Sequence, residues 1–348
     1  MRRVTTLVAA LAAATLVLSA CGGDDDDDTS SGDTSSPTAQ SDVRVGVAYD
    51  IGGRGDQSFN DSAAVGIDQA IDEYGVEVEE LEASAGETDA DKAERLRLLA
   101  EGGFNPVIAI GFAYSKPIGE VAAEYPDTNF AMIDDTANDL PNLANLVFAE
   151  EQGSFLVGVI AANASPNNNV GFIGGVEVEL IKKFQAGFTE GVHAVKPDAI
   201  VQVQYLTQVP DFTGFNDPAK GKTAAEGMFD AGADIVFHAA GGSGGGLFEA
   251  AQAAGKLAIG VDSDQYLQPA YAAVKDVILT SMIKRVDIAV YEFIKSAVEG
   301  DTLTGNTLFD LEVDGVGYST SNDAVSAYVE GVDDYAAQIV DGSLEVPT

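Results

Sequence analysis

The chain has 348 residues and a formal net charge of −38, from 18 lysines and arginines against 56 aspartates and glutamates. This sign of charge excludes nucleic-acid binding, which needs a basic surface, and it disfavours a phosphate-rich ligand. Hydrophobic residues make up 46% of the chain, which is enough for a globular body. A chain of this length exceeds what one hydrophobic core normally holds, so we expect two lobes.

The first twenty residues have the pattern of an export signal. Two arginines precede an apolar run over residues 4–18, which is shorter than the ~20 residues that a membrane-spanning helix needs. Small residues then lead to Cys21, the only cysteine of the chain. We therefore interpret residues 1–20 as a lipoprotein signal peptide and expect Cys21 to be lipidated, because a lone free thiol is unusual in an exported protein. The alternative is a plain signal peptide that happens to contain a cysteine.

Residues 21–42 are rich in Gly, Ser, Thr and Asp and contain no apolar cluster that would nucleate a core. We expect them to form a disordered tether behind the lipid on Cys21. Two or more acyl chains give stable attachment, so the predicted location is extracytoplasmic, anchored to the cell membrane. The aspartate run at residues 24–28 lacks the glycine and terminal glutamate of a calcium loop, and we expect no metal there.

From residue 43 onward, short β-branched runs alternate with helical stretches. This alternation predicts parallel sheets with crossover helices, and two series of five strands predict two similar doubly wound lobes. The predicted strands are 43–49, 76–83, 107–112, 129–133 and 143–149, then 169–174, 200–206, 233–239, 257–261 and 277–280. The predicted helices include 90–101, 154–162, 180–195, 219–231 and 281–298.

Polar residues gather where several predicted strands end. Asp50 follows the first strand, Asp134 the fourth and Asp262 the ninth, and a glycine-rich turn at 241–246 follows the eighth. Ligands of open α/β sheets bind beyond the carboxyl ends of the strands. These residues therefore predict a ligand cleft between the lobes, although aspartates at such places also cap helices and start turns.

The enzyme motifs in the chain are incomplete. Residues 241–245 match G-x-S-x-G around Ser243, but His193 and His238, the only histidines, both precede it, whereas a hydrolase needs a histidine after the serine. The same turn does not match the G-x-G-x-x-G dinucleotide pattern. The segment that ends at Lys222 resembles a phosphate loop but lacks the first glycine that such a loop needs. We expect no catalysis, no metal and no cofactor.

Four motifs, in order, resemble the basic membrane protein family: GDQSFN at 55–60, AAGGSG at 239–244, VDSDQ at 261–265 and SMIKRVD at 281–287. The resemblance runs from about Val43 to Tyr318. Members of this family are lipoprotein receptors of ABC transporters, and one branch binds purine nucleosides. The resemblance implies a type I periplasmic-binding-protein fold, with two doubly wound parallel-sheet lobes joined by hinge crossings.

From this resemblance we expect lobe 1 to comprise residues 43–147 with about 263–300. Lobe 2 is expected to comprise 148–262 with about 301–345. The implied partners are a nucleoside, the permease and ATPase subunits of an ABC importer, and the membrane through the lipid anchor, with the receptor itself a monomer.

The resemblance also implies the residues that hold the base. Asp50, nine residues before Phe59, would contact the base, and Phe59 would form one face of an aromatic sandwich with Asn60 beside it. Phe215 would supply the opposite ring, although Phe212 is close enough in sequence to do so instead. Stacking between two rings contributes ~1–3 kcal/mol per base, and carboxylates accept hydrogen bonds from base N–H groups.

Four further positions follow from the same resemblance. Asp134 would also reach the base, while Gly242 and Asp262 would hold the ribose, with Lys284 as an ammonium donor. Carboxylates would repel phosphates, so a nucleoside is favoured over a nucleotide. Two alternatives stay open: a receptor of the same fold for another polar solute such as a sugar or signalling molecule, and a sensory surface lipoprotein without a transport role.

Overall fold

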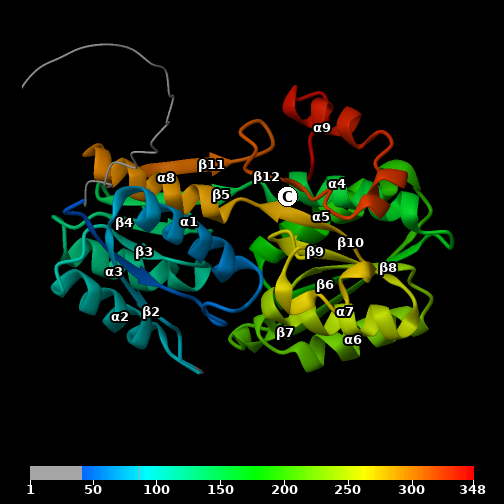
Figure 1. Ribbon diagram of the computed structural model, residues 1–348, viewed down its shortest axis with the longest axis horizontal. Coiled ribbons are helices and arrows are strands. Elements are labelled where there is room, and N and C mark those ends of the chain that lie inside the picture. The colour runs from blue at the N-terminus through cyan, green and yellow to red at the C-terminus, as the bar shows by residue number, and fades with distance from the viewer. Residues whose placement is uncertain (1–40, 85) are drawn as a thin grey trace, which may run out of the picture. The chain divides into compact units, whose positions relative to one another are not determined.

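The computed structural model describes residues 41–84 and 86–348. The predicted signal peptide, Cys21 and nearly all of the predicted tether lie outside the described residues. The described body is built around two six-stranded sheets with helices packed against them (Figure 1). This arrangement confirms the predicted α/β fold with two parallel-dominated sheets.

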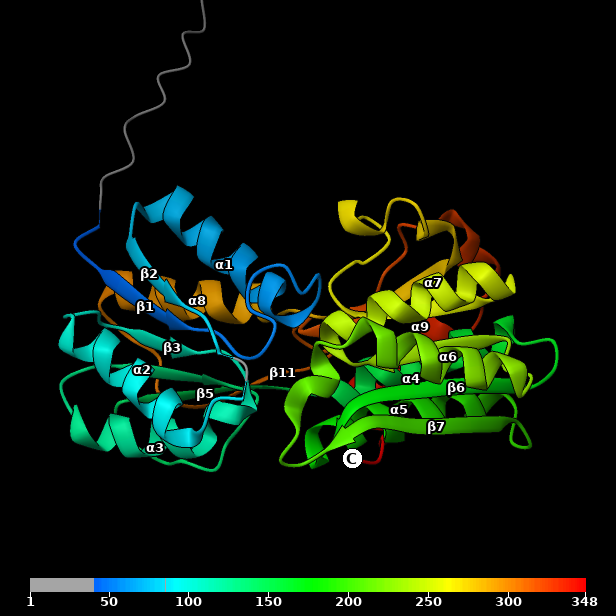
Figure 2. The same cartoon turned by 90° about the horizontal axis from the view of Figure 1, so that it is seen from below.

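The first sheet has the strand order β11-β5-β4-β3-β1-β2, and every neighbouring pair is parallel. Helices α1 and α8 cover one face and α2 and α3 the other (Figures 1 and 2). The strands are β1 (Arg44–Ala48), β2 (Glu77–Leu81), β3 (Val107–Ala109), β4 (Phe130–Ile133), β5 (Leu143–Phe148) and β11 (Gly305–Phe309). The helices are α1 (Phe59–Tyr74), α2 (Asp89–Glu101), α3 (Ser115–Glu124) and α8 (Val286–Glu299).

The second sheet has the order β12-β10-β9-β8-β6-β7, and only the β10–β12 pair is antiparallel. Helices α4 and α5 pack together on this part of the molecule, as do α6 and α7 (Figure 2). The strands are β6 (Asn169–Glu177), β7 (Ile200–Gln208), β8 (Ile235–Ala239), β9 (Leu257–Asp262), β10 (Ile278–Lys284) and β12 (Val316–Tyr318). The helices are α4 (Glu150–Ala164), α5 (Glu179–Val195), α6 (Pro218–Asp230), α7 (Gly244–Ala254) and α9 (Val332–Val340).

The helix predicted over residues 281–298 begins later in the structure than expected. Residues Ser281–Lys284 belong to β10, and α8 begins only at Val286. Strand β10 is buried on both faces, so its apolar run carries no alternation that would distinguish a strand from a buried helix.

The sheet pairing also differs from the predicted division into lobes. Strand β10, within the segment 263–300 expected in lobe 1, pairs with β9 in the second sheet. Strand β11, within 301–345 expected in lobe 2, pairs with β5 in the first sheet. The described chain therefore crosses between the sheets after β5, after β10 and after β11. Local sequence patterns do not report which strands pair, whether the strands are consecutive, as β9 and β10 are, or far apart in the chain, as β5 and β11 are.

Within the described residues, the helices fall short of the length and apolarity that crossing a bilayer requires.

Candidate functional site

A pocket lies beyond the carboxyl ends of strands from both sheets. It has an empty volume of about 560 Å³, part of it open to solvent, which is within the ~300–1,000 Å³ range of small-molecule sites. The first sheet contributes the segments after β1, β3 and β4. The second sheet contributes the segment after β7 and the carboxyl ends of β8, β9 and β10, and the first half of α5 completes the lining. The lining residues are Asp50, Ile51, Asp56, Phe59, Asn60, Gly111, Phe112, Asp134, Leu180, Ile181, Phe184, Phe215, Ala239, Gly241, Val261, Asp262 and Lys284.

Seven of the eight predicted ligand residues line this pocket: Asp50, Phe59, Asn60, Asp134, Phe215, Asp262 and Lys284. The exception is Gly242, whose place in the wall is taken by Gly241. Gly241 has φ of +52°, a left-handed conformation that favours glycine. A Cβ on Gly242 would lie 3.3 Å from Asn216 Oδ1 and in ordinary contact with the carbonyl oxygen of Asp56 at 3.7 Å, so Gly242 faces these two segments.

The loop between β1 and α1 is organised by Asp56, which belongs to the GDQSFN motif but is not among the predicted site residues. Its Oδ1 accepts a hydrogen bond from the Ser58 amide at 2.8 Å, and its Oδ2 accepts from the amide and Nδ2 of Asn60, both at 2.9 Å. Burial raises the pKa of Asp56, while these hydrogen bonds oppose the shift. Since Nδ2 of Asn60 is held in this way, its Oδ1 is left buried without a hydrogen-bond partner among the described residues.

Two of the pocket aspartates have a strained backbone. Asp134 has φ of +73° and Asp262 has φ of +64°, a region that non-glycine residues seldom occupy. Each follows or ends a buried strand, so the left-handed turn directs the carboxylate toward the carboxyl-end edge of its sheet. Such strain concentrates at functional sites, because the surrounding structure must hold the residue in place.

Lys284, at the end of β10, is paired with two carboxylates. Its side chain is 2% exposed, and its Nζ lies 2.7 Å from Asp134 Oδ2 and 3.1 Å from Glu150 Oε1. The same Nζ lies 4.9 Å from the ring centroid of Phe148 and 5.2 Å from that of Phe59. Burial lowers the pKa of Lys284, but the surrounding carboxylates outweigh burial and raise it. Lys284 thus connects its own strand in the second sheet to Asp134 of the first sheet and to Glu150 at the start of α4.

The remaining carboxylate oxygens of the pocket have few hydrogen-bond donors. Asp134 Oδ1 is buried without a hydrogen-bond partner in the described residues. Burial raises the pKa of Asp134, with Lys284 opposing the shift. Burial also raises the pKa of Asp50 to about 6 and that of Asp262 to about 7. The pocket therefore offers oxygen acceptors that lack donors, and a ligand with N–H or O–H groups would supply them.

The aromatic rings of the pocket come from both sides. Phe59 begins α1, Phe112 follows β3, and Phe215 lies in a short 3-10 helix after β7. The Phe112 ring makes edge contacts with Phe215 at 6.2 Å and with Phe212 at 5.8 Å between centroids. Phe215 lines the pocket and Phe212 does not. The position of Phe215 depends on Gly175, because a Cβ there would lie 2.4 Å from Phe215 Cδ1.

Hydrogen bonds connect the two sides of the pocket. Ser58 Oγ donates to Asp262 Oδ2 at 2.5 Å, and Gln265 Nε2 donates to the Gln57 carbonyl at 2.9 Å. Ser263 Oγ also donates to the carbonyl of Ser58 at 3.3 Å. The loop from the first sheet is therefore held against the end of β9 in the second, which makes both sheets part of one site.

Comparison with known proteins agrees with this geometry. A family described as ABC transporter substrate-binding protein, PnrA-like, matches residues 43–348. The "CD4+ T-cell-stimulating antigen" of Listeria monocytogenes is 38% identical, with 89% of each chain covered. The "ABC transporter nucleoside-binding protein BmpA" of Lactococcus lactis is 31% identical, with coverage of 90% of this chain and 92% of the relative.

Solved structures give the same result. An ABC transporter solute-binding protein from Aeropyrum pernix superposes with a TM-score of 0.77 at 28% identity, over 88% of this chain and 94% of the other. A galactofuranose-binding protein superposes with a TM-score of 0.58 at 16% identity, over 84% of this chain and 99% of the other, which shows a shared fold alone. The chain therefore belongs to the family of PnrA-like ABC transporter substrate-binding proteins.

Proposed function

We propose that this protein is the membrane-anchored receptor of an ABC importer and that it binds a nucleoside, with a purine base, in the pocket between the two sheets. The observation that carries the proposal is one pocket with phenylalanine rings from both sheets and two buried oxygens, Asp134 Oδ1 and Asn60 Oδ1, that have no donor among the described residues. The relative from Lactococcus lactis named as a nucleoside-binding protein supports the same ligand class.

The chemistry of a nucleoside suits this pocket. A purine has two π faces for Phe59 and Phe215, and stacking contributes ~1–3 kcal/mol per base. Its N–H groups would donate to Asp50 and Asp134, and the ribose hydroxyls would donate to Asp262. The carboxylates of the pocket would repel the phosphates of a nucleotide.

We infer that the ligand acts by closing the two lobes. It would contact groups from both sheets, so it favours the closed form by its higher affinity for that form. The permease would then recognise the closed receptor. Lipidation at Cys21 would hold a monomeric receptor at the outer surface of the membrane, where the permease lies.

Calorimetric titration of the purified protein with inosine, guanosine, adenosine and AMP tests the ligand class. We expect micromolar or tighter binding of at least one nucleoside and much weaker binding of AMP. Absence of binding to every nucleoside would refute the proposal, and binding of sugars instead would favour the alternative receptor. Mass spectrometry of the ligand carried through purification gives an independent answer.

Lipidation needs a separate test. Expression of the full chain should place it in the membrane fraction, and Cys21→Ser should release it without changing nucleoside affinity. Release of the wild-type chain to the same extent would contradict the anchor.

A further inference from the structure

A second pocket adjoins the first and shares Asp50 and Ile51 with it. It has an empty volume of about 450 Å³, part of it open to solvent. One wall comes from the first-sheet side and includes Glu87 and Lys92, while the opposite wall is the segment 210–213 that follows β7 of the second sheet. Because each sheet supplies one wall, this pocket belongs to the same interlobe cleft.

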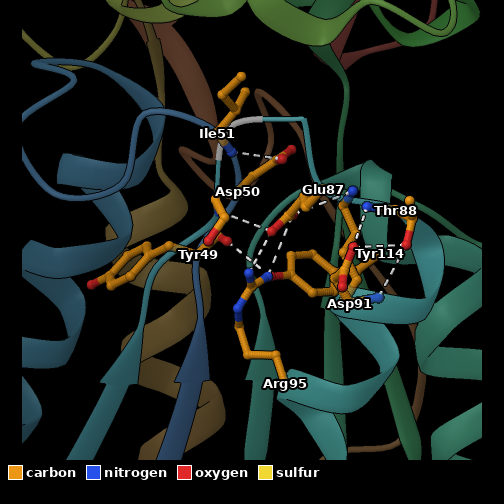
Figure 3. A network of polar contacts seen from close by, with 10 residues as sticks. Tyr49, Asp50, Ile51, Glu87, Thr88, Asp91, Arg95 and Tyr114 are labelled. Atoms are coloured by element: carbon orange, nitrogen blue, oxygen red, sulfur yellow. Dashed lines mark hydrogen bonds and ion pairs between the residues drawn. The ribbon is translucent and has the colours of Figure 1, made fainter.

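The first wall carries two buried cations that share one ion-pair partner. Lys92 and Arg95 are 5% and 8% exposed, and both pair with the carboxylate of Glu87. Figure 3 shows Arg95 extending from α2 toward Glu87 and Tyr114, with Asp50 close to them. Asp50 lines the same pocket and makes no ion pair within 4 Å with either cation in the described chain. A buried charge that shares its partner is costly unless something else compensates it.

The first turn of α2 fixes these side chains. Thr88 caps the helix, with its amide donating to Asp91 Oδ2 at 2.8 Å and its Oγ1 accepting from the Asp91 amide. Lys92 and Arg95 are three residues apart, so they lie on the same face of α2. Within residues 41–84 and 86–348, Lys92 Nζ has the ion pair with Glu87 at 3.3 Å and no hydrogen bond. Its other N–H donors are available to the pocket that it lines.

Asp50 lies on the boundary between the two pockets. Its Oδ1 accepts the Ile51 amide at 2.7 Å, while Oδ2 accepts no hydrogen bond from the part of the chain that the structure describes. Lys92 is also close enough for its charge to lower the pKa of Asp50, against the larger effect of burial. An acceptor on Asp50 and a donor on Lys92 thus lie on neighbouring parts of one continuous wall.

We propose that the second pocket is a subsite for a carbonyl oxygen on the base, with Lys92 as its donor and Asp50 as the acceptor for the adjoining N–H. This inference rests on the proposed nucleoside function and narrows the ligand class to 6-oxopurine nucleosides. Such a base has N1–H beside the C6 carbonyl, which matches an acceptor beside a cationic donor. An adenine base has an acceptor at N1 and a donor at C6, so Lys92 would face a donor.

Phe212 supports the subsite from the opposite wall. The Phe212 ring lines the second pocket, whereas Phe215, three residues on, lines the first. Phe112 contacts both rings by its edge. The 3-10 helix Phe212–Phe215 therefore covers both pockets, and closure over a base in the first would also cover its C6 edge in the second.

Two ligands that differ only at the N1–C6 edge of the base test the subsite without any mutation. The wild-type protein should bind inosine about 10- to 100-fold more tightly than purine riboside, which lacks both the 6-oxygen and the N1–H, because hydrogen bonds to charged groups contribute at least that much. The affinity for inosine should also exceed the affinity for adenosine by a similar factor. Equal affinities for inosine and purine riboside would overturn the subsite.

The second measurement uses Lys92→Met, with Lys116→Met as the matched control on the exposed surface of the first-sheet side. Lys92→Met should weaken the binding of inosine by about tenfold or more and the binding of purine riboside by little. Lys116→Met should change the binding of neither ligand. An equal loss for both ligands, or for neither, would overturn the role of Lys92. Failure of the wild type to bind any nucleoside would refute the proposed function itself, and the subsite with it.

Discussion

Two buried lysines of the cleft differ in the number of carboxylates that pair with them. Lys284, at the end of β10, has two carboxylates within 3.1 Å, so the protein itself neutralises it. Lys92, on α2, shares Glu87 with Arg95 and has no other anionic partner within 4 Å in the described chain. The difference indicates that Lys284 mainly positions Asp134 and connects the two sheets, whereas Lys92 retains donors for a ligand.

The largest effect is expected from breaking the Lys284 cluster. Lys284→Met would leave Asp134 and Glu150 buried without their cation, and removing one partner of a buried ion pair costs about 3–5 kcal/mol. Urea denaturation should show this loss in the free energy of unfolding. Lys295→Met is the control, since that lysine pairs with Glu292 at 3.2 Å on the surface and should change stability by less than about 1 kcal/mol. Equal losses in the two variants would contradict the positioning role of Lys284.

The buried carboxylates predict a dependence of stability on pH. Burial raises the pKa of Asp262 from 3.8 to about 7, so the folded state binds a proton more tightly than the unfolded state does. This residue therefore destabilises the fold as pH rises from about 4 to 7, by a few kcal/mol in the limit of full burial. Asp262→Asn should remove that part of the slope, and asparagine tolerates the left-handed backbone at this position.

Thermal unfolding of the wild type and Asp262→Asn between pH 4.5 and 8 measures this difference. The stability of the variant relative to the wild type should increase toward pH 8. A constant difference across the range would show that Asp262 does not titrate in this window.

Substitutions of Phe215 and Phe212 should change the nucleoside affinity to different extents, because the two rings line different pockets. Phe215→Ala should weaken nucleoside binding by ~1–3 kcal/mol, because it removes a stacking ring from the first pocket. Phe212→Ala should have a smaller effect, since its ring lines only the second pocket. Calorimetry on both variants with the same nucleoside gives the comparison. A larger loss for Phe212→Ala would identify it as the stacking ring and exchange the assigned roles.

The smallest effect is expected for the stability of Lys92→Met. Arg95 would still neutralise Glu87, so the buried carboxylate keeps a cation, and the expected loss is about 1 kcal/mol or less rather than the ~3–5 kcal/mol of a buried charge left unpaired. Urea denaturation beside Lys284→Met measures the contrast between the two lysines. A loss as large as that of Lys284→Met would mean that Lys92 is structural and that the two lysines do not differ in role.

Much of the site followed from sequence because it consists of strand ends. Asp50, Asp134 and Asp262 come directly after or at the end of buried strands, and parallel strands bring their carboxyl ends to one edge. Phe59 and Asn60 were assigned through a motif resemblance, and the structure places both in the pocket. Gly241 lines the pocket in place of its neighbour Gly242, because successive residues of the 3-10 helix Gly241–Ser243 face different directions.

By itself, the sequence determined the alternation of strands and helices and the fold class, since these depend on local patterns. It also predicted seven residues that line the pocket, three from their places at strand ends and four through the family resemblance. Only the tertiary structure decided that β10 lies in the second sheet, that β11 returns to the first, and that Glu150 pairs with Lys284. It also brought Lys92, 42 positions after Asp50 in the chain, to a pocket that Asp50 lines. The physical reason is the same in each case: strand pairing and charge pairing depend on which segments meet in space, and local residue patterns carry no record of those contacts.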